Sequence, residues 1–197
     1  GDAVKMPVAL IDLLAAHQLK EGILIALLHR FKTGKGSLIT TSLFESAIAS
    51  LANQATNYLM ADHIPTKMGT QHPNIAPYGD QFQTKDDKTI ILAIGNNKQF
   101  QGLCDILELP ELIDHPDFSN NKSRVVHRRK LADLLRPYFK KRKAAYWATQ
   151  FAGKKVPAGA IKNLAEVFEE PMARNMVLAD KMEDGTISKR VKTVAFD

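Results

Sequence analysis

The sequence has a single cysteine and no long run of uncharged apolar residues. Cys104 cannot form an internal disulfide, which excludes a disulfide-stabilised secreted scaffold and predicts a reducing compartment. The most apolar stretch, residues 9–28, is interrupted by Asp12, Lys20 and Glu21, which excludes a membrane-spanning helix there. The first residues lack a basic segment followed by an apolar one, so no secretory signal is expected.

Several common functional motifs are also missing. The chain has no Walker A loop, no glycine-rich dinucleotide fingerprint, no His-Glu-x-x-His and no Gly-x-Ser-x-Gly. Its six histidines are scattered without the spacing of metal ligands, so no metal site is expected. Cys104 lies between Leu103 and Ile106, a context that favours a core position over a nucleophile.

What the chain does have is a globular composition with unevenly distributed charge. Its 197 residues are 45% hydrophobic and 24% charged, with a net charge of +6, and could form one domain or two small ones. Residues 120–160 hold twelve basic side chains against one acidic residue, Asp133. This excess fits either an anionic partner or a solvated helix surface. Four aromatic residues accompany it, and their spacing favours the core sides of helices over base stacking: Tyr138, Phe139, Tyr146 and Trp147.

Hydrophobic periodicity and turn signals predict a mixed α and β chain. Helices are expected at residues 9–31, 43–60, 97–107, 123–139, 144–151 and 163–169. Strands are expected at residues 38–42, at 81–84 and 89–94 as one hairpin, and at 176–182 and 187–194 as another. A boundary near residues 60–69 would separate residues 1–62 from a smaller α+β domain, residues 63–197.

Asp12 is an unusual residue on the first predicted helix. It shares a face with Ala15, Ala16 and Leu19, so we expect its carboxylate to be largely desolvated and stabilised as the anion by the helix N-terminal amides. The two alanines would let a ligand approach it. The alternative is an ordinary N-cap aspartate, although Ala15 stands where a capping box has Glu or Gln.

A second unusual segment is the polar stretch of residues 69–79. Two prolines fix an extended path, while His72, Asn74 and Tyr78 offer hydrogen-bonding groups at regular intervals. Such a loop suits recognition of an anionic substrate. The same composition is also typical of a connection between domains, and both interpretations stay open at this point.

Together these segments resemble the family III CoA-transferases of the CaiB/BaiF type. The resemblance rests on Val-Ala-Leu-Ile-Asp-Leu-Leu at residues 8–14, Gly-Ile-Leu-Ile-Ala-Leu-Leu at 22–28, Thr-Gly-Lys-Gly at 33–36 and Val-Pro-Ala-Gly at 156–159. The 69–78 segment and Ile-Gly-Asn-Asn-Lys-Gln-Phe at 94–100 most resemble the succinate–hydroxymethylglutarate branch, which acts on dicarboxylates.

The resemblance implies an α/β fold in which this chain is a central fragment. It would hold the nucleophile helix, linker helices and the small α+β domain, without the nucleotide-binding half that supplies most CoA contacts. It also implies that Asp12 is the covalent nucleophile, forming a mixed anhydride and then an aspartyl-CoA thioester. Leu43 would lie near CoA, and the acceptor would be recognised by His72, Asn74 and Tyr78.

Further expectations about partners follow from the same resemblance. Coenzyme A would be a substrate rather than a permanently bound cofactor, and the other substrates would be carboxylic acids, with a dicarboxylate such as succinate expected. The protein would form an interlocked homodimer, bind no membrane, and reside in the cytoplasm, or in the mitochondrial matrix of a eukaryote. Nucleic acid is not expected as a partner.

Two alternatives to a CoA-transferase are a racemase and a binding module. An α-methylacyl-CoA racemase-type enzyme would move a proton beside the thioester. It is disfavoured because residues 93–100 lack the carboxylate that the racemase branch has in this segment. A non-enzymatic helical module could instead bind nucleic acid through residues 120–160, and it would show strongly salt-dependent binding to unrelated oligonucleotides.

Overall fold

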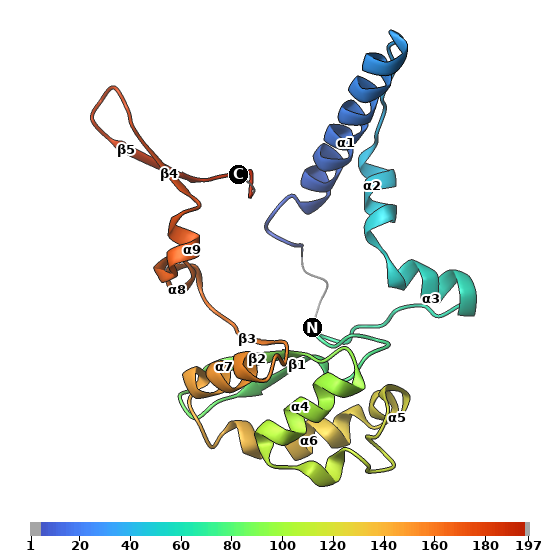
Figure 1. Ribbon diagram of the computed structural model, residues 1–197, viewed down its shortest axis with the longest axis vertical. Coiled ribbons are helices and arrows are strands. Elements are labelled where there is room, and N and C mark those ends of the chain that lie inside the picture. The colour runs from blue at the N-terminus through green and yellow to red at the C-terminus, as the bar shows by residue number, and fades with distance from the viewer. Residues whose placement is uncertain (1–4, 196–197) are drawn as a thin grey trace. The chain divides into compact units, whose positions relative to one another are not determined.

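The computed structural model describes residues 5–195, which form a mixed helical and stranded chain. The chain divides between Lys67 and Met68 into two compact units (Figure 1). Within the described residues, no helix has both the length and the hydropathy needed to cross a membrane.

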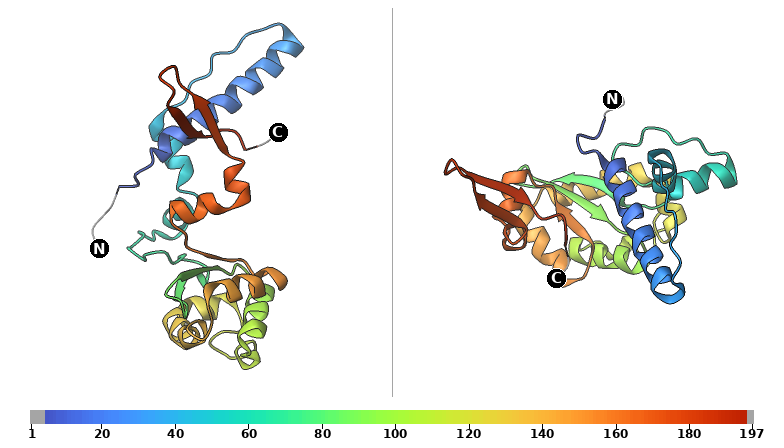
Figure 2. Two further views of the ribbon diagram at one scale, coloured as in Figure 1. Left: turned by 90° about the vertical axis from the view of Figure 1, so that its left-hand side faces the viewer. Right: turned by 90° about the horizontal axis from the view of Figure 1, so that it is seen from above.

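The first unit is built on the long helix α1 (Leu10–Thr33). Gly34 ends the helix in the left-handed conformation, at φ 71°, and its N–H donates to the carbonyl of Arg30. The chain then runs back along α1, as Figures 1 and 2 both show. Gly22 permits this return, because a Cβ atom there would lie 2.7 Å from the Cγ2 of Ile39.

Two predictions for the first unit are wrong. Residues 38–42 are extended but pair with no other strand in the described chain, since β-branched residues favour the backbone angles without supplying a partner. The helix expected over residues 43–60 is two helices, α2 (Leu43–Ser50) and α3 (Asn53–Ala61). They are separated because Ala52 has a positive φ of 48°, which a continuous right-handed helix excludes.

The described part of the first unit has almost no core. Ala15 and Ser46 are its buried residues, and the Ser46 hydroxyl donates to Gln18 Oε1 at 3.4 Å. Large apolar side chains are instead exposed on all sides of α1 and on α2 and α3, among them Ile25, Leu28, Phe31, Phe44, Leu59 and Met60.

The second unit begins with a three-stranded antiparallel sheet of order β1 (Tyr78–Gln83), β2 (Thr89–Ala93) and β3 (Ala158–Ala160). The predicted first hairpin is therefore confirmed, while the short strand β3 was not predicted. The helices that follow β2 are α4 (Asn97–Leu107), η1 (Pro110–Leu112), α5 (Asn121–Val126), α6 (Arg128–Phe139) and α7 (Ala144–Gly153). The helix expected over 123–139 is thus divided at His127.

Helices α4, α6 and α7 gather on one side of this sheet, as both Figures 1 and 2 show, and enclose the core. Cys104 lies in that core as predicted, and burial raises the pKa of its thiol to about 12. Phe139 and Trp147 are buried there too, and the Trp147 indole donates to the Phe139 carbonyl at 3.0 Å. The core role predicted for these two residues is confirmed, and Tyr138 packs partly buried against the same core, but the prediction is wrong for Tyr146, which is 42% exposed.

The chain continues through two short helices into a second hairpin. Helix α8 (Leu164–Glu169) starts with a capping box between Asn163 and Glu166, and α9 (Pro171–Arg174) follows it. Strands β4 (Val177–Lys181) and β5 (Ile187–Val191) pair antiparallel, confirming the predicted hairpin.

Candidate functional site

Asp12 is the third residue of α1 and is exposed in this chain. Its predicted desolvation is therefore wrong for the described residues, because little packs against this part of α1. The N-cap alternative is wrong as well, since Ala9 occupies the N-cap without a side-chain hydrogen bond. A carboxylate in the first turn is still stabilised by the positive end of the helix dipole.

Leu43 is the first residue of α2, in the same unit as Asp12. The helix start is fixed by Ser42, whose hydroxyl accepts from the Glu45 N–H at 3.1 Å and donates to the Glu45 carboxylate at 2.7 Å. The Leu43 side chain is 54% exposed, so it presents an apolar surface at the helix start.

The 69–79 segment is a loop that closes on itself. The Thr70 hydroxyl donates to the Gly79 carbonyl at 2.6 Å, and the His72 N–H donates to the Tyr78 carbonyl at 2.9 Å. Gly79 has a φ of 82°, and a Cβ atom there would lie 1.7 Å from the Thr70 carbonyl oxygen. Only glycine fits this close approach of two backbone segments.

Closure brings the three predicted acceptor-binding residues together. The rings of His72 and Tyr78 meet edge to face, with centroids 5.4 Å apart, and Tyr78 remains 38% exposed. Asn74 is exposed, and its N–H donates to the His72 Nδ1 at 3.2 Å. The loop of residues 69–79 therefore holds an imidazole, an amide and a phenol, which are groups that can hydrogen-bond a carboxylate.

Arg124 anchors this loop from within the core. Its side chain is fully buried and stacks on the Phe100 ring, with its guanidinium carbon 4.4 Å from the ring centroid. It donates to the carbonyls of Ala76 and Phe118 at 2.8 and 2.9 Å, and to the Asn97 side-chain oxygen at 2.9 Å. Burial lowers the pKa of Arg124 from its ordinary value.

Asn121 and Arg128 hold the same loop from its other carbonyls. The Asn121 side chain accepts from the Ala76 N–H at 3.1 Å and donates to the Asn74 carbonyl at 2.8 Å. Arg128 donates to the carbonyls of His72 and Pro73 at 2.9 and 3.0 Å. The sequence analysis did not single out Asn121, Arg124 and Arg128 as residues that hold the loop, because they stand in a run that resembles a solvated basic face.

Asp80 lies buried next to this loop at the start of β1. Its Oδ1 accepts from the Gln71 amide at 2.6 Å, while its Oδ2 is buried without a hydrogen-bond partner in the described chain. Burial raises the pKa of Asp80, and the Gln71 bond and the charge of Arg128 oppose that rise.

The basic segment is less available to an anionic partner than its composition indicates. Arg124 and Arg128 bind backbone carbonyls, and three further cations form ion pairs with carboxylates: Lys130 with Asp117, Arg136 with Asp133 and Lys140 with Asp87. Within residues 5–195, no three His, Cys, Asp or Glu side chains are clustered as a metal site would require.

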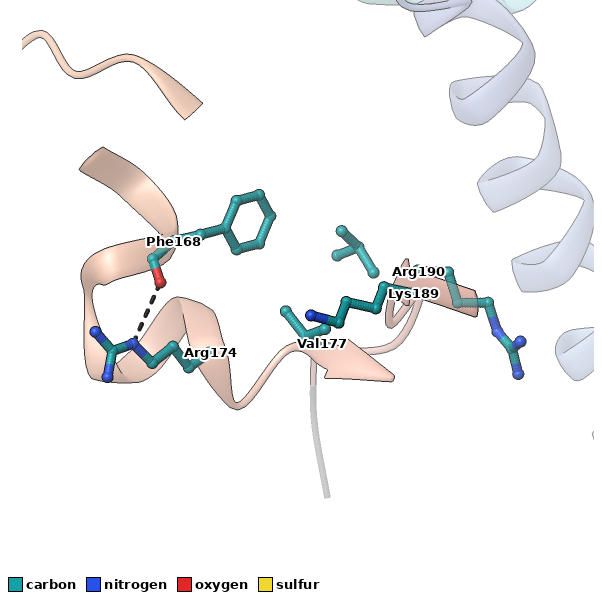
Figure 3. Close-up of a pocket in the computed structure, with 6 residues that line it drawn as sticks. Phe168, Arg174, Val177, Lys189 and Arg190 are labelled. Atoms are coloured by element: carbon teal, nitrogen blue, oxygen red, sulfur yellow. Dashed lines mark hydrogen bonds between the residues drawn. The ribbon is translucent and has the colours of Figure 1, made fainter. Parts of the chain in front are cut away.

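A separate pocket of about 560 Å³ lies beside the second hairpin and was not predicted. It is lined by Phe168, Arg174, Val177, Lys189, Arg190 and Val191. Figure 3 shows the Phe168 ring directed toward this space, whereas the guanidinium groups of Arg174 and Arg190 point away from it. Arg190 pairs with Asp180 at 2.5 Å, so the pocket is mainly apolar.

Asp12 and Leu43 belong to the first unit, and the His72, Asn74 and Tyr78 cluster belongs to the second. The predicted site residues therefore fall into two groups, one in each unit. One is a carboxylate in the first turn of a helix, able to act as a nucleophile toward an acyl carbon. The other is a hydrogen-bonding loop held by buried side chains.

Comparison with known proteins gives a consistent family. The sequence matches CoA-transferase family III over residues 1–197. It is 38% identical to human succinyl-CoA:glutarate CoA-transferase over 96% of this chain and 43% of that protein. It is 33% identical to the succinate–glutarate CoA-transferase of Agrobacterium fabrum over 98% of this chain and 48% of that protein. The chain thus spans about half the length of the curated relatives it matches.

Solved structures share the fold. A CAIB/BAIF family protein from Brucella suis superimposes with a TM-score of 0.64 and 34% identity, covering 96% of this chain and 53% of that one. Rv3272 from Mycobacterium tuberculosis gives a TM-score of 0.81 at 22% identity, covering 99% of this chain and 51% of that one. The second likeness shows the fold alone.

Proposed function

Because this chain belongs to CoA-transferase family III, we propose that the protein containing it moves CoA between carboxylic acids, at least one of them a dicarboxylate such as succinate or glutarate. The observation that carries the proposal is the 38% identity to a succinyl-CoA:glutarate CoA-transferase over 96% of the chain. The second relative, at 33% identity, is named for the same pair of acids.

In the proposed mechanism, Asp12 is the covalent nucleophile. Its carboxylate attacks the thioester carbonyl of the donor acyl-CoA and expels the CoA thiolate, which leaves a mixed anhydride. The thiolate then attacks the aspartyl carbonyl of this anhydride, which releases the donor acid and leaves an aspartyl-CoA thioester. Each step replaces one activated acyl bond by another, so no water or outside energy source is needed.

The second half of the cycle reverses the first with a new acid. The acceptor carboxylate attacks the aspartyl thioester and expels the CoA thiolate, forming a second anhydride. Attack of the thiolate on the acceptor's acyl carbonyl yields the new acyl-CoA and restores the Asp12 carboxylate. Water must be excluded while either anhydride exists. Since Asp12 is exposed in this chain, we expect the rest of a family-length protein to cover it.

Substrate recognition is divided between the two units in this proposal. Leu43 offers an exposed apolar side chain to the CoA arm, and the exposed Asn74 and Tyr78, with the half-buried His72 beside them, bind the acceptor carboxylate. Coenzyme A enters and leaves as a substrate. This chain alone is expected to transfer CoA poorly.

The assembly and compartment are also proposals. The exposed apolar side chains of α1 to α3 support a homodimer, because patches of this kind mark surfaces that become covered. The single buried thiol fits a reducing compartment, either the cytoplasm or the mitochondrial matrix. Light scattering on the full-length protein would show a monomer if the dimer is wrong.

The test is to trap the intermediate on the full-length protein. The enzyme is incubated with succinyl-CoA, quenched with hydroxylamine and digested, and the peptides are examined by mass spectrometry. Hydroxylamine converts an activated aspartyl group to a hydroxamate, so we expect this modification on Asp12. Glutarate added before the quench should yield glutaryl-CoA and reduce the trapped fraction. Turnover without any modified Asp12 peptide, or a hydroxamate on another carboxylate, would overturn the assignment.

A further inference from the structure

Arg128 ties the beginning of α6 to the loop that carries the three proposed acceptor ligands. Its two terminal nitrogens donate to the consecutive carbonyls of His72 and Pro73, at 2.9 and 3.0 Å. Its Nε donates to the Val125 carbonyl at 3.3 Å, which fixes the side chain to its own helical segment. The planar guanidinium thus holds two neighbouring peptide groups in one orientation.

The remaining loop carbonyls are held in the same manner. Asn121 binds the carbonyl of Asn74 and Arg124 binds that of Ala76. Four of the five carbonyls from residue 72 to residue 76 therefore accept from side chains of α5 and α6. With these carbonyls turned toward α5 and α6, the exposed Asn74 is presented on a fixed backbone.

Arg128 hydrogen-bonds backbone carbonyl groups and no carboxylate of the described chain. Its donors are directed to carbonyl oxygens, and the buried Asp80 acts on it through space without a hydrogen bond to it. A guanidinium committed to carbonyls sets backbone geometry. Three of its five N–H donors bind carbonyl oxygens, and two of those carbonyls belong to the loop.

We propose that Arg128 is a positioning residue for acceptor recognition, fixing the backbone of His72 and Pro73 so that the loop meets the acceptor acid in a single conformation. This inference rests on the proposed function of the loop. Arg124 has the larger structural role because it is fully buried. Arg128 is only partly buried, so its loss affects the loop more than the core.

The experiment compares three variants of the full-length protein: Arg128→Met, Arg128→Lys and Arg129→Met. Arg129 is the adjacent arginine of α6 and is exposed, which makes it the matched control. Steady-state kinetics with succinyl-CoA and glutarate give a separate KM for each substrate. Hydrogen–deuterium exchange of peptides covering residues 69–79 reports loop order independently of activity.

We expect Arg128→Met to raise the acceptor KM by about tenfold, the cost of losing one to two charge-assisted hydrogen bonds, with the succinyl-CoA KM changed less than about twofold. Exchange in residues 69–79 should become faster, and the melting temperature should fall only slightly. Arg128→Lys should recover part of the acceptor KM, since an ammonium can reach the carbonyls without the planar fork. Arg129→Met should match the wild type.

Three results would overturn the inference. One is unchanged loop exchange in Arg128→Met. Another is faster exchange with an unchanged acceptor KM. The third is an equal rise of both KM values with a large fall in melting temperature in Arg128→Met and Arg128→Lys alike, which would mean a structural role only. A wild-type enzyme that transfers no CoA would instead overturn the proposed function, and the role of Arg128 in recognition with it.

Discussion

The two units of this chain use their apolar residues in opposite ways. In the second unit, leucine and phenylalanine side chains of four helices and a sheet form one core around Leu103, Leu135 and Phe139, all fully buried. In the first unit, α1 is equally apolar yet has only Ala15 buried. The same apolar residue types therefore form a core in the second unit and lie exposed to solvent in the first.

The difference shows that the two parts of the proposed site are held by different means. The loop with His72 and Tyr78 is fixed by hydrogen bonds from residues of its own unit. Asp12 is placed only by α1, and a helix in a protein draws most of its stability from packing of its apolar face against other elements. The proposed nucleophile thus depends on surfaces that the described part of its own unit does not supply.

The largest expected effect tests whether the sparsely packed unit carries the chemistry. Asp12→Asn in the full-length protein removes the proposed nucleophile with little change in side-chain size. We expect CoA transfer from succinyl-CoA to glutarate to fall by about 10³-fold or more, while folding is retained. The rate is measured by chromatography of the acyl-CoA products.

Glu21→Gln is the matched control, because it removes an exposed carboxylate from the same helix. It should leave the rate within about twofold of wild type. Turnover by Asp12→Asn near the wild-type rate would show that Asp12 is not the nucleophile.

The next effect measures the contrast in packing directly. Leu135 is 0% exposed and Leu28 is 63% exposed. We expect Leu135→Ala to lower the free energy of unfolding of the second unit by about 3 kcal/mol, because it leaves a cavity, and Leu28→Ala to change it by less than about 0.5 kcal/mol. Trp147, the only tryptophan, lies in the core of the second unit, so its fluorescence during urea unfolding reports that unit.

Equal losses in these two variants would break the comparison. Because Trp147 reports the second unit, they would mean that Leu28 is covered in solution and contributes to the stability of that unit.

A third, smaller effect concerns the closure of the loop. Gly79→Ala places a Cβ atom against the Thr70 carbonyl and forces a positive φ on alanine, so we expect a loss of about 2 kcal/mol in the same urea experiment. Gly153→Ala is the control, since a Cβ atom there meets nothing within 4 Å at the end of α7. It should be neutral or slightly stabilising. A neutral Gly79→Ala would show that the loop can open without cost to its unit.

The smallest expected effect is a pH dependence from Asp80. Burial raises the pKa of Asp80 in the folded state above its ordinary value of 3.8, so the unfolded chain loses this proton first as the pH rises. This group therefore lowers the free energy of unfolding as the pH rises from about 4 through its folded-state pKa. Asp80→Asn should flatten that part of the profile, measured by urea unfolding at a series of pH values.

The exposed Asp114 supplies the control, and Asp114→Asn should leave the slope as it is in the wild type. An unchanged slope in Asp80→Asn would mean that the buried carboxyl is not the titrating group.

The sequence predicts local elements well where periodicity and turn chemistry agree. Helix α1, the 81–94 hairpin and the hairpin around Asp184 and Gly185 follow from apolar spacing and turn residues. Residues 38–42 show the limit of this approach. Their β-branched side chains indicate an extended backbone, but a strand needs a partner that local sequence does not reveal.

The candidate site was likewise predicted only in part, because local sequence does not reveal tertiary contacts. His72, Asn74 and Tyr78 are recognisable from their composition, and the closed loop does bring them together. Arg124 and Arg128 could not be recognised, because an arginine that binds backbone carbonyls differs from a solvated one only in its tertiary contacts. Asp12 was expected to be desolvated from the helix face it occupies, and burial likewise depends on what packs against that face.

The use of backbone carbonyls by Arg124 and Arg128 has a consequence for work at different ionic strengths. Ion pairs between exposed groups, such as Arg136 with Asp133, weaken as dissolved salt screens them. A guanidinium whose hydrogen bonds go to neutral carbonyl oxygens has no ion pair in those bonds for salt to screen. The loop of residues 69–79 should therefore keep its shape at high salt concentration. A loss of activity on adding salt would then indicate weaker binding of the CoA phosphates.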